Sequence, residues 1–143
     1  MDNIDLAIIN LLRKNSRMTS SEISKKINLS IPAVSERIRK LEEYGFIELY
    51  TVKLNRAMVN LNLTAFIFVN VNIQDLSTFK TNVIKYPCVY ECHHIAGEFD
   101  YLLKIVVADT SSLESFITND LKQQLSVAKT NTIIVLSTLK EQI

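Results

Sequence analysis

The chain has 143 residues, of which 48% are apolar and 22% are charged, with 16 Lys and Arg against 15 Asp and Glu. This length excludes a large enzyme and fits one ordinary domain or two small ones, and the apolar content excludes a disordered tail. The formal net charge of +1 argues weakly against a nucleic-acid binder, because such proteins are usually strongly basic.

No stretch of the sequence approaches the ~20 continuous apolar residues of a membrane span. The N-terminus begins with the acidic Asp2 and lacks the basic and then apolar layout of a signal peptide. We therefore expect a soluble, cytoplasmic protein that has no membrane partner.

Apolar residues recur at helical spacing up to Gly45, which predicts three short helices. Thr19 and Glu22 have the spacing of a capping box, and Ser30 stands before Pro32, which is tolerated in a first helical turn. Gly45 follows the third helix, where a left-handed residue is favoured. The residues predicted to face inward are Ile4, Ile8, Leu11, Leu12, Ile23, Ile27, Val34, Ile38 and Leu41.

From Thr64 onward the apolar period becomes two, as in a half-buried strand. The first predicted element is a strand whose buried face runs from Ala65 to Ile73, and a helix follows from Leu76 and ends before Pro87. Strands over 89–96 and 101–107 come next. A helix over 111–125, which opens with a capping box at Ser111, and a strand over 130–139 complete the domain. This order is the split βαβ or ferredoxin-like arrangement.

The chain is therefore predicted to be an α+β protein in three parts. These are a three-helix, winged helix-turn-helix domain over residues 1–46, a linker over 47–63 with an extended strand from Ile47 to Leu54, and a ferredoxin-like βαββαβ domain over 64–143. Residues 1–63 hold 10 Lys and Arg against 7 Asp and Glu, a net +3, and residues 64–143 hold 6 against 8, a net −2. The near-neutral total conceals a basic helical half.

Cys88, Cys92, His93 and His94 together look like a metal site. In a strand the two cysteines are roughly 13 Å apart at ~3.3 Å per residue, which is too far for a disulfide. Adjacent strand residues face opposite ways and cannot converge on one ion. We expect buried thiols and one surface imidazole, with no metal site or cofactor.

The second and third helices are joined by Asn28, Leu29 and Ser30, about the turn length of a helix-turn-helix. Asparagine accepts the left-handed backbone that this turn requires. Arg39 and Lys40 can neutralise phosphates, and the helix start at Ser30 can donate backbone N–H groups to one. The candidate DNA-binding residues are Thr19, Ser30, Pro32, Ala33, Ser35, Glu36, Arg37, Arg39 and Lys40.

Two other interpretations of the third helix stay open. Basic residues on an amphipathic helix often form only a solvated face, in which Glu36 and Lys40 make an ordinary i,i+4 pair. Three short helices with this spacing also occur as protein-docking modules.

Residues 64–143 contain no catalytic constellation, so a binding role is favoured there. Their one unusual feature is the turn from Ala96 to Asp100, which holds this domain's only glycine. Gly97 can expose backbone N–H groups to a ligand carboxylate, and Glu98 or Asp100 can hold an ammonium group. An ordinary solvated hairpin turn is the alternative.

The two halves resemble, over essentially the whole chain, the Lrp/AsnC family of leucine-responsive and asparagine regulators, also called feast/famine proteins. In the first half the matching residues are Asp2, Asp5, Ile8, Ile9, Leu12, Glu22–Ser24, Leu29, Ser30, Val34, Arg37, Ile38, Leu41, Glu42 and Gly45–Ile47. In the second half they are Glu91–His93 and Gly97–Lys104. Asn28 departs from the usual turn glycine, and a basic N-terminal extension is missing.

The resemblance implies a transcriptional regulator that binds double-stranded DNA, is not an enzyme, and forms dimers that associate into tetramers, octamers or larger rings. It also implies a small-molecule effector, such as an amino acid, bound between neighbouring dimers. The candidate effector-binding residues are His94, Ala96, Gly97, Glu98, Phe99, Asp100, Thr130, Thr132 and Ile134. Phe66 and Phe68 support dimerisation, because they lie on the otherwise polar face of their strand.

Two alternative functions remain. Tetrapyrrole (sirohaem) decarboxylases look similar to this family over both domains, and His93 and His94 can serve such a substrate. The basic, small-residue third helix speaks against an enzyme. The other alternative is an assembly protein that modulates its relatives without binding DNA.

Overall fold

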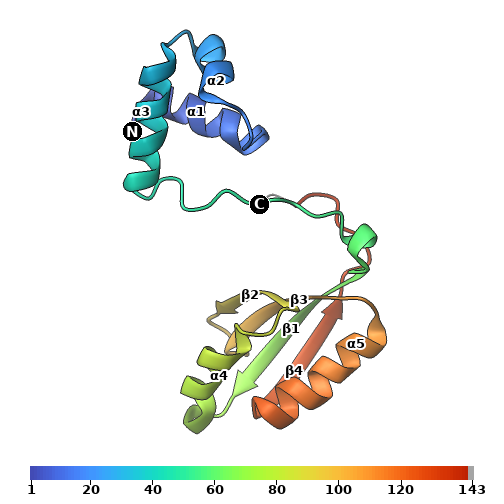
Figure 1. Cartoon of the computed structure of the whole chain (residues 1–143). Helices are drawn as coiled ribbons and strands as arrows, with labels where there is room; N and C mark the ends of the chain where they lie inside the picture. The colour runs from blue at the N-terminus through green and yellow to red at the C-terminus, as the bar shows by residue number, and fades with distance from the viewer. Residues whose placement is uncertain (142–143) are drawn as a thin grey trace. The chain divides into compact units, whose positions relative to one another are not determined.

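The computed structural model describes residues 1–141 and contains a helical unit, Met1–Lys53, and a sheet unit that begins at Leu54 (Figure 1). The helical unit consists of α1 (Asn3–Lys14), α2 (Ser20–Ile27) and α3 (Ile31–Glu43). Ile8, Leu12, Ile23, Val34 and Leu41 form its buried core, as predicted. Ile4, Leu11, Ile27 and Ile38 pack against that core.

Local hydrogen bonds begin and end these helices. Thr19 Oγ1 accepts from the Glu22 N–H at 3.2 Å and the Glu22 carboxylate accepts from the Thr19 N–H at 2.7 Å, so the predicted capping box is confirmed. Asn28 and Gly45 both have the predicted left-handed backbone, with φ of 54° and 72°. The cap of α1 by Asp2 was not predicted. The Asp2 carboxylate accepts from the Asp5 N–H at 2.8 Å.

The expected extended strand between Ile47 and Leu54 is wrong for the single chain. Among residues 1–141, no strand pairs with this segment, and Leu49 and Val52 are 75% and 77% exposed. A strand requires a partner for its ladder of hydrogen bonds, and the alternation of side chains alone does not supply one. The segment leads instead into a 3₁₀ turn, η1 (Arg56–Val59).

The sheet unit confirms the predicted order of elements. It runs through β1 (Leu63–Val71), α4 (Leu76–Val83), β2 (Val89–His94), β3 (Tyr101–Val107), α5 (Thr110–Ser115) and β4 (Val127–Ile134). The strands form one antiparallel sheet in the order β2-β3-β1-β4. Both helices lie on one face of it (Figure 1), where Phe79, Val83, Phe116 and Leu121 pack on the buried side chains of β1 and β3.

Several predicted boundaries of the sheet unit are corrected. Ile73 is 93% exposed, because β1 ends at Val71 and the chain turns into a 3₁₀ turn, η2 (Ile73–Asp75). Asp109 rather than Ser111 caps α5, with its carboxylate accepting from the Ser112 N–H at 2.8 Å. α5 continues as a wider π-helical segment, η3 (Phe116–Gln124).

The last strand begins at Val127, not at residue 130, and ends at Ile134, not at residue 139. Its start follows Ser126, whose left-handed φ of 52° turns the chain back along β1. Its end follows from its partner, because β1 begins at Leu63 and offers few residues to pair with beyond Ile134. Pairing length is thus decided by the neighbouring strand.

The sheet has a second, open face that neither α4 nor α5 covers (Figure 1). Residues directly opposite one another in an antiparallel pair share a face, so the register places Ile133 and Leu102 on the same side as Phe66 and Phe68. Phe66, Phe68 and Leu102 are half-buried, and Ile133 is 53% exposed. We call these four residues the open-face patch.

Candidate DNA-binding surface and effector site

The start of α3 presents a small, exposed surface. Ser30 Oγ accepts from the Ala33 N–H at 3.4 Å and so begins the helix. Ser30, Pro32 and Ser35 are exposed, and Ala33 is half-buried beneath them. A capped helix N-terminus with small side chains permits close approach to a phosphate or to base edges.

Ile31 belongs to the same exposed surface, and sequence analysis missed it. Its side chain is 48% exposed at the first position of α3. Apolar spacing assigns Ile31 to the inward face, three residues before Val34, so the pattern contained no signal of its exposure.

Arg37 forms ion pairs with two carboxylates at the start of α1. Its guanidinium donates to carboxylate oxygens of Asp2 and Asp5, each at 2.7 Å. These bonds, from Asp5 first, raise the pKa of Arg37, while the Asp5 N–H and then Arg37 lower the pKa of Asp2. Arg37 therefore connects α3 to the start of α1 and is not directed away from the unit.

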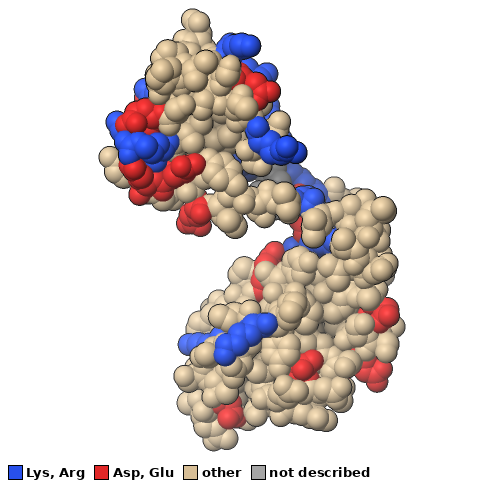
Figure 2. All heavy atoms as spheres, viewed as in Figure 1, with Lys and Arg blue, Asp and Glu red and all other residues tan. Residues whose placement is uncertain are grey.

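The other cations of α3 lie beside acids of the same helix. Arg39 donates to Glu36 at 2.7 Å and also to Glu43, and Lys40 lies 3.6 Å from Glu36. The Glu36 bond is the main cause of the raised pKa of Arg39. Basic and acidic groups are accordingly interleaved on the visible surface of the helical unit (Figure 2).

The last turn of α2 differs from α3 in this respect. Lys25 and Lys26 are exposed there and form no ion pair with any residue in the 1–141 range. Unpaired cations contribute fully to the attraction of phosphates. They are absent from the predicted DNA-binding residues, all of which except Thr19 lie on α3 or at its N-cap.

Hydrogen bonds from β1 hold the turn after β2 in shape. The Asn70 side chain accepts from the Asp100 N–H at 2.9 Å and donates to the Glu98 carbonyl at 3.1 Å. Asp100 Oδ2 accepts from the Val71 N–H at 2.9 Å. One oxygen of Asp100 is therefore occupied in fixing the turn, and Asn70 positions the turn from the neighbouring strand.

The exposed side of the turn meets the start of β4. Lys129 Nζ donates to Glu98 Oε1 at 2.7 Å and lies 5.0 Å from the centre of the Phe99 ring. The Phe99 ring in turn lies 5.6 Å from that of Phe68. Gly97 is exposed, and a Cβ built on it would meet nothing within 4 Å, so packing within the chain does not demand a glycine there.

The effector candidates that belong to strands lie on the face of the sheet that the helices cover. Thr130, Thr132 and Ile134 pair with Val69, Ile67 and Ala65, which face the helices. His94 pairs with Tyr101 and stacks on its ring at 4.9 Å. The structure thus brings Glu98, Phe99 and Asp100 together with Asn70 and Lys129, and within one chain it does not bring these strand residues to the turn.

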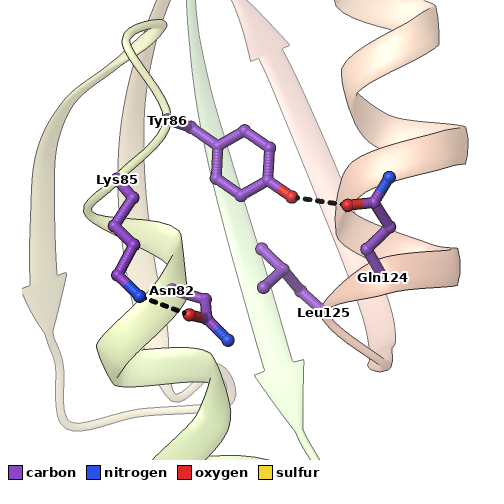
Figure 3. A pocket seen from close by; sticks show the side chains of 5 residues that line it. All are labelled: Asn82, Lys85, Tyr86, Gln124 and Leu125. Carbon is purple, nitrogen blue, oxygen red and sulfur yellow. Dashed lines mark hydrogen bonds between the residues drawn. The ribbon is translucent and has the colours of Figure 1, made fainter.

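A separate cavity of about 360 Å³ lies between the end of α4 and the end of η3 (Figure 3). Asn82, Lys85, Tyr86, Gln124 and Leu125 line it, and the Tyr86 hydroxyl lies 3.1 Å from Gln124 Oε1 across it. None of the predicted effector residues lines this cavity.

Cys88, Cys92 and the two histidines do not converge. His93 pairs with Leu102 on the open face, 3.2 Å from Glu91, whereas His94 pairs with Tyr101 on the helix side. Burial raises the pKa of both thiols, which keeps them protonated and poor as metal ligands. No group of three His, Cys, Asp or Glu residues in the described chain is arranged to hold a metal ion.

Within residues 1–141, no helix combines the length and the apolar character needed to cross a membrane.

Both units match described protein families. Residues 64–143 match the model of the Lrp/AsnC ligand binding domain, and residues 1–48 match that of a winged helix-turn-helix DNA-binding domain. Neither description is that of a decarboxylase.

Individual relatives match over nearly the full chain. The leucine-responsive regulatory protein of Escherichia coli K12 is 36% identical over 144 residues, covering 99% of this chain and 88% of that protein. A transcriptional regulator of Neisseria meningitidis in complex with L-Met has a TM-score of 0.95 at 30% identity, covering 99% of this chain and 94% of that one. Bacillus subtilis LrpC has a TM-score of 0.90 at 33% identity, with 99% of each chain covered.

Proposed function

This chain belongs to the Lrp/AsnC family of DNA-binding transcriptional regulators, and we propose that it reads double-stranded DNA with the start of α3 and senses an amino acid at the turn from Ala96 to Asp100. It is a regulator and not an enzyme. A regulator of transcription acts where the DNA is, so we place the protein in the cytoplasm.

The exposed start of α3 is the observation that supports DNA reading. The recognition helix of a helix-turn-helix contacts bases with its N-terminal residues. Ser30 and Ser35 offer hydroxyl groups to base edges or phosphates, and Ile31 offers an apolar contact to a thymine methyl group. Lys25, Lys26, Arg39 and Lys40 supply phosphate contacts, which position the protein without reading sequence.

The effector proposal rests on the turn that Asn70 and Asp100 hold in place. A fixed turn with an exposed glycine can bind a carboxylate through its N–H groups, and Glu98 can bind an ammonium group. An α-amino acid contains both groups, and the Neisseria meningitidis relative was solved with L-Met. We restrict the site within one chain to this turn and Lys129.

The open-face patch supports dimerisation. Apolar side chains that a lone domain leaves uncovered mark an interaction surface, and a two-fold pairing of this face buries Phe66, Phe68, Leu102 and Ile133 against their copies. Two α3 helices then reach half-sites ~34–36 Å apart on a pseudo-palindromic sequence. Effector binding acts by biasing how dimers associate into tetramers, octamers or larger rings.

Selection of bound fragments from genomic DNA, with and without a mixture of amino acids, tests this function. We expect a shared pseudo-palindromic sequence among the fragments and an altered set when amino acids are present. Ile31→Ala is expected to lose the shared sequence while retaining non-specific binding, and Leu6→Ala, another exposed apolar residue of the helical unit, serves as the control. Enrichment of the same sequence by the Ile31 variant would rule out the proposed reading surface.

A further inference from the structure

The ammonium group of Lys129 occupies a small cation-binding site beside the turn from Ala96 to Asp100. It is bounded by the Glu98 carboxylate at 2.7 Å and by the face of the Phe99 ring, whose centre is 5.0 Å away. A carboxylate and an aromatic face are two groups that attract an ammonium ion. In this chain the ammonium group of a lysine already lies against both.

The contacts that hold the turn do not involve Lys129. Asn70 and Asp100 fix the backbone of the turn through bonds to β1 of 2.9–3.1 Å, and Phe99 packs against Phe68. Asp100 has one oxygen engaged with Val71, whereas Glu98 has no partner other than Lys129 for its carboxylate within residues 1–141. Glu98 is therefore the carboxylate that an incoming ammonium group can take over.

We propose that Lys129 is a built-in competitor for the effector's ammonium group, so that an amino acid binds by displacing it from Glu98 and Phe99. This inference rests on the effector site proposed above. The Lys129 and Glu98 side chains are 56% and 71% exposed, and exposed ion pairs of this kind are weak. An amino acid can therefore displace the Lys129 ammonium group at little cost. Lys129 lowers the affinity of the site for the amino acid but does not prevent binding.

The opposite role for Lys129 makes the opposite prediction. If its ammonium group instead receives the effector's carboxylate, removal of Lys129 weakens binding. The sign of the change in affinity therefore decides between competition and direct recognition.

Calorimetric titration of the full chain with L-methionine and L-leucine tests the proposal. Lys129→Met is expected to bind either amino acid up to about fivefold more tightly, which corresponds to ~1 kcal/mol for an exposed ion pair. Lys129→Arg keeps the competing charge and is expected to match the wild type. Lys122→Met, which removes an exposed lysine from η3, is the matched control.

A second ligand tests the group that is displaced. 4-(Methylthio)butanoate, which is methionine without its ammonium group, is expected to gain nothing from Lys129→Met. Equal or weaker amino-acid binding by Lys129→Met, with binding by the wild type intact, overturns the competitor role alone. No binding of any common amino acid by wild type or variant, with DNA binding intact, overturns the effector site itself and the competitor role with it.

Discussion

The arginines of α3 have different roles although they are two residues apart. Arg37 donates to Asp2 and Asp5, and its side chain is 31% exposed, whereas Arg39 is 53% exposed and is paired only within its own helix. Exposed pairs contribute about 0–1 kcal/mol, so Arg39 can exchange Glu36 for a phosphate at little cost. Release of Arg37 would instead break its two bonds to the start of α1.

Arg39→Ala is expected to weaken binding to specific and non-specific DNA alike and to lower the slope of log affinity against log salt by about one. Glu36→Gln is expected to do the reverse, because it removes one of the two negative charges that are paired with Arg39. Gel-shift titrations over a range of salt concentrations measure both effects. Lys80→Ala, on the exposed side of α4, should leave the slope unchanged, and an unaltered slope in Arg39→Ala would contradict a phosphate contact.

At the scale of elements, a chain of charged groups connects the segment after β4 to the sheet. Lys104 of β3 lies 2.6 Å from Glu141 and 2.9 Å from Glu91 of β2, and Arg56 of η1 lies 2.9 Å from Glu141. The Lys104 bond, with Arg56 beside it, lowers the pKa of Glu141 from 4.5 to about 2. Glu141 is thus more acidic when folded and stabilises the sheet unit in its ionised form.

The sign of this shift gives a pH dependence. A lowered folded pKa adds stability above the unfolded pKa and loses it as the pH falls through the folded value. The difference in unfolding free energy between wild type and Glu141→Gln should therefore be constant above pH 4.5 and shrink as the pH approaches 2. Urea unfolding at a series of pH values measures this difference. A difference that stays constant down to pH 2 would show that folding does not lower the pKa of Glu141.

At the scale of the molecule, the helical unit is closed around its own core while the sheet unit leaves one apolar face uncovered. The net charge of +3 over residues 1–63 gives only weak attraction to DNA. Firm binding therefore depends on several subunits acting together. The open-face patch is the surface through which we expect this to happen.

Ile133→Asp is expected to shift the protein toward monomers, because it buries a charge in the paired open faces. Light scattering after size-exclusion chromatography measures the mass, and DNA affinity should fall on the order of 100-fold with the loss of the second contact. Ile84→Asp changes an equally apolar residue that is 66% exposed at the end of α4, and it should leave the mass unaltered. A full-size assembly formed by Ile133→Asp would place the interface elsewhere.

Local features of this structure were predictable from sequence. The Thr19 capping box, the left-handed Asn28 and the alternation along β1 each depend on residues within a few positions of one another. The turn from Ala96 to Asp100 was also identified as unusual from its residue types. The end of β4 was not predictable, because it depends on where its partner β1 begins.

The contacts that define the candidate sites could not be predicted from the sequence. Arg37 meets Asp2 across 35 positions and Lys129 meets Glu98 across 31, and charge pairing at such distances follows from helix packing and strand register. The sequence by itself determined the order of the helices and strands in each unit and the division of charge, because periodicity and caps act locally. Only the tertiary structure decided which cations form ion pairs, which lie exposed without one, and that the ammonium group of Lys129 lies beside the turn from Ala96 to Asp100.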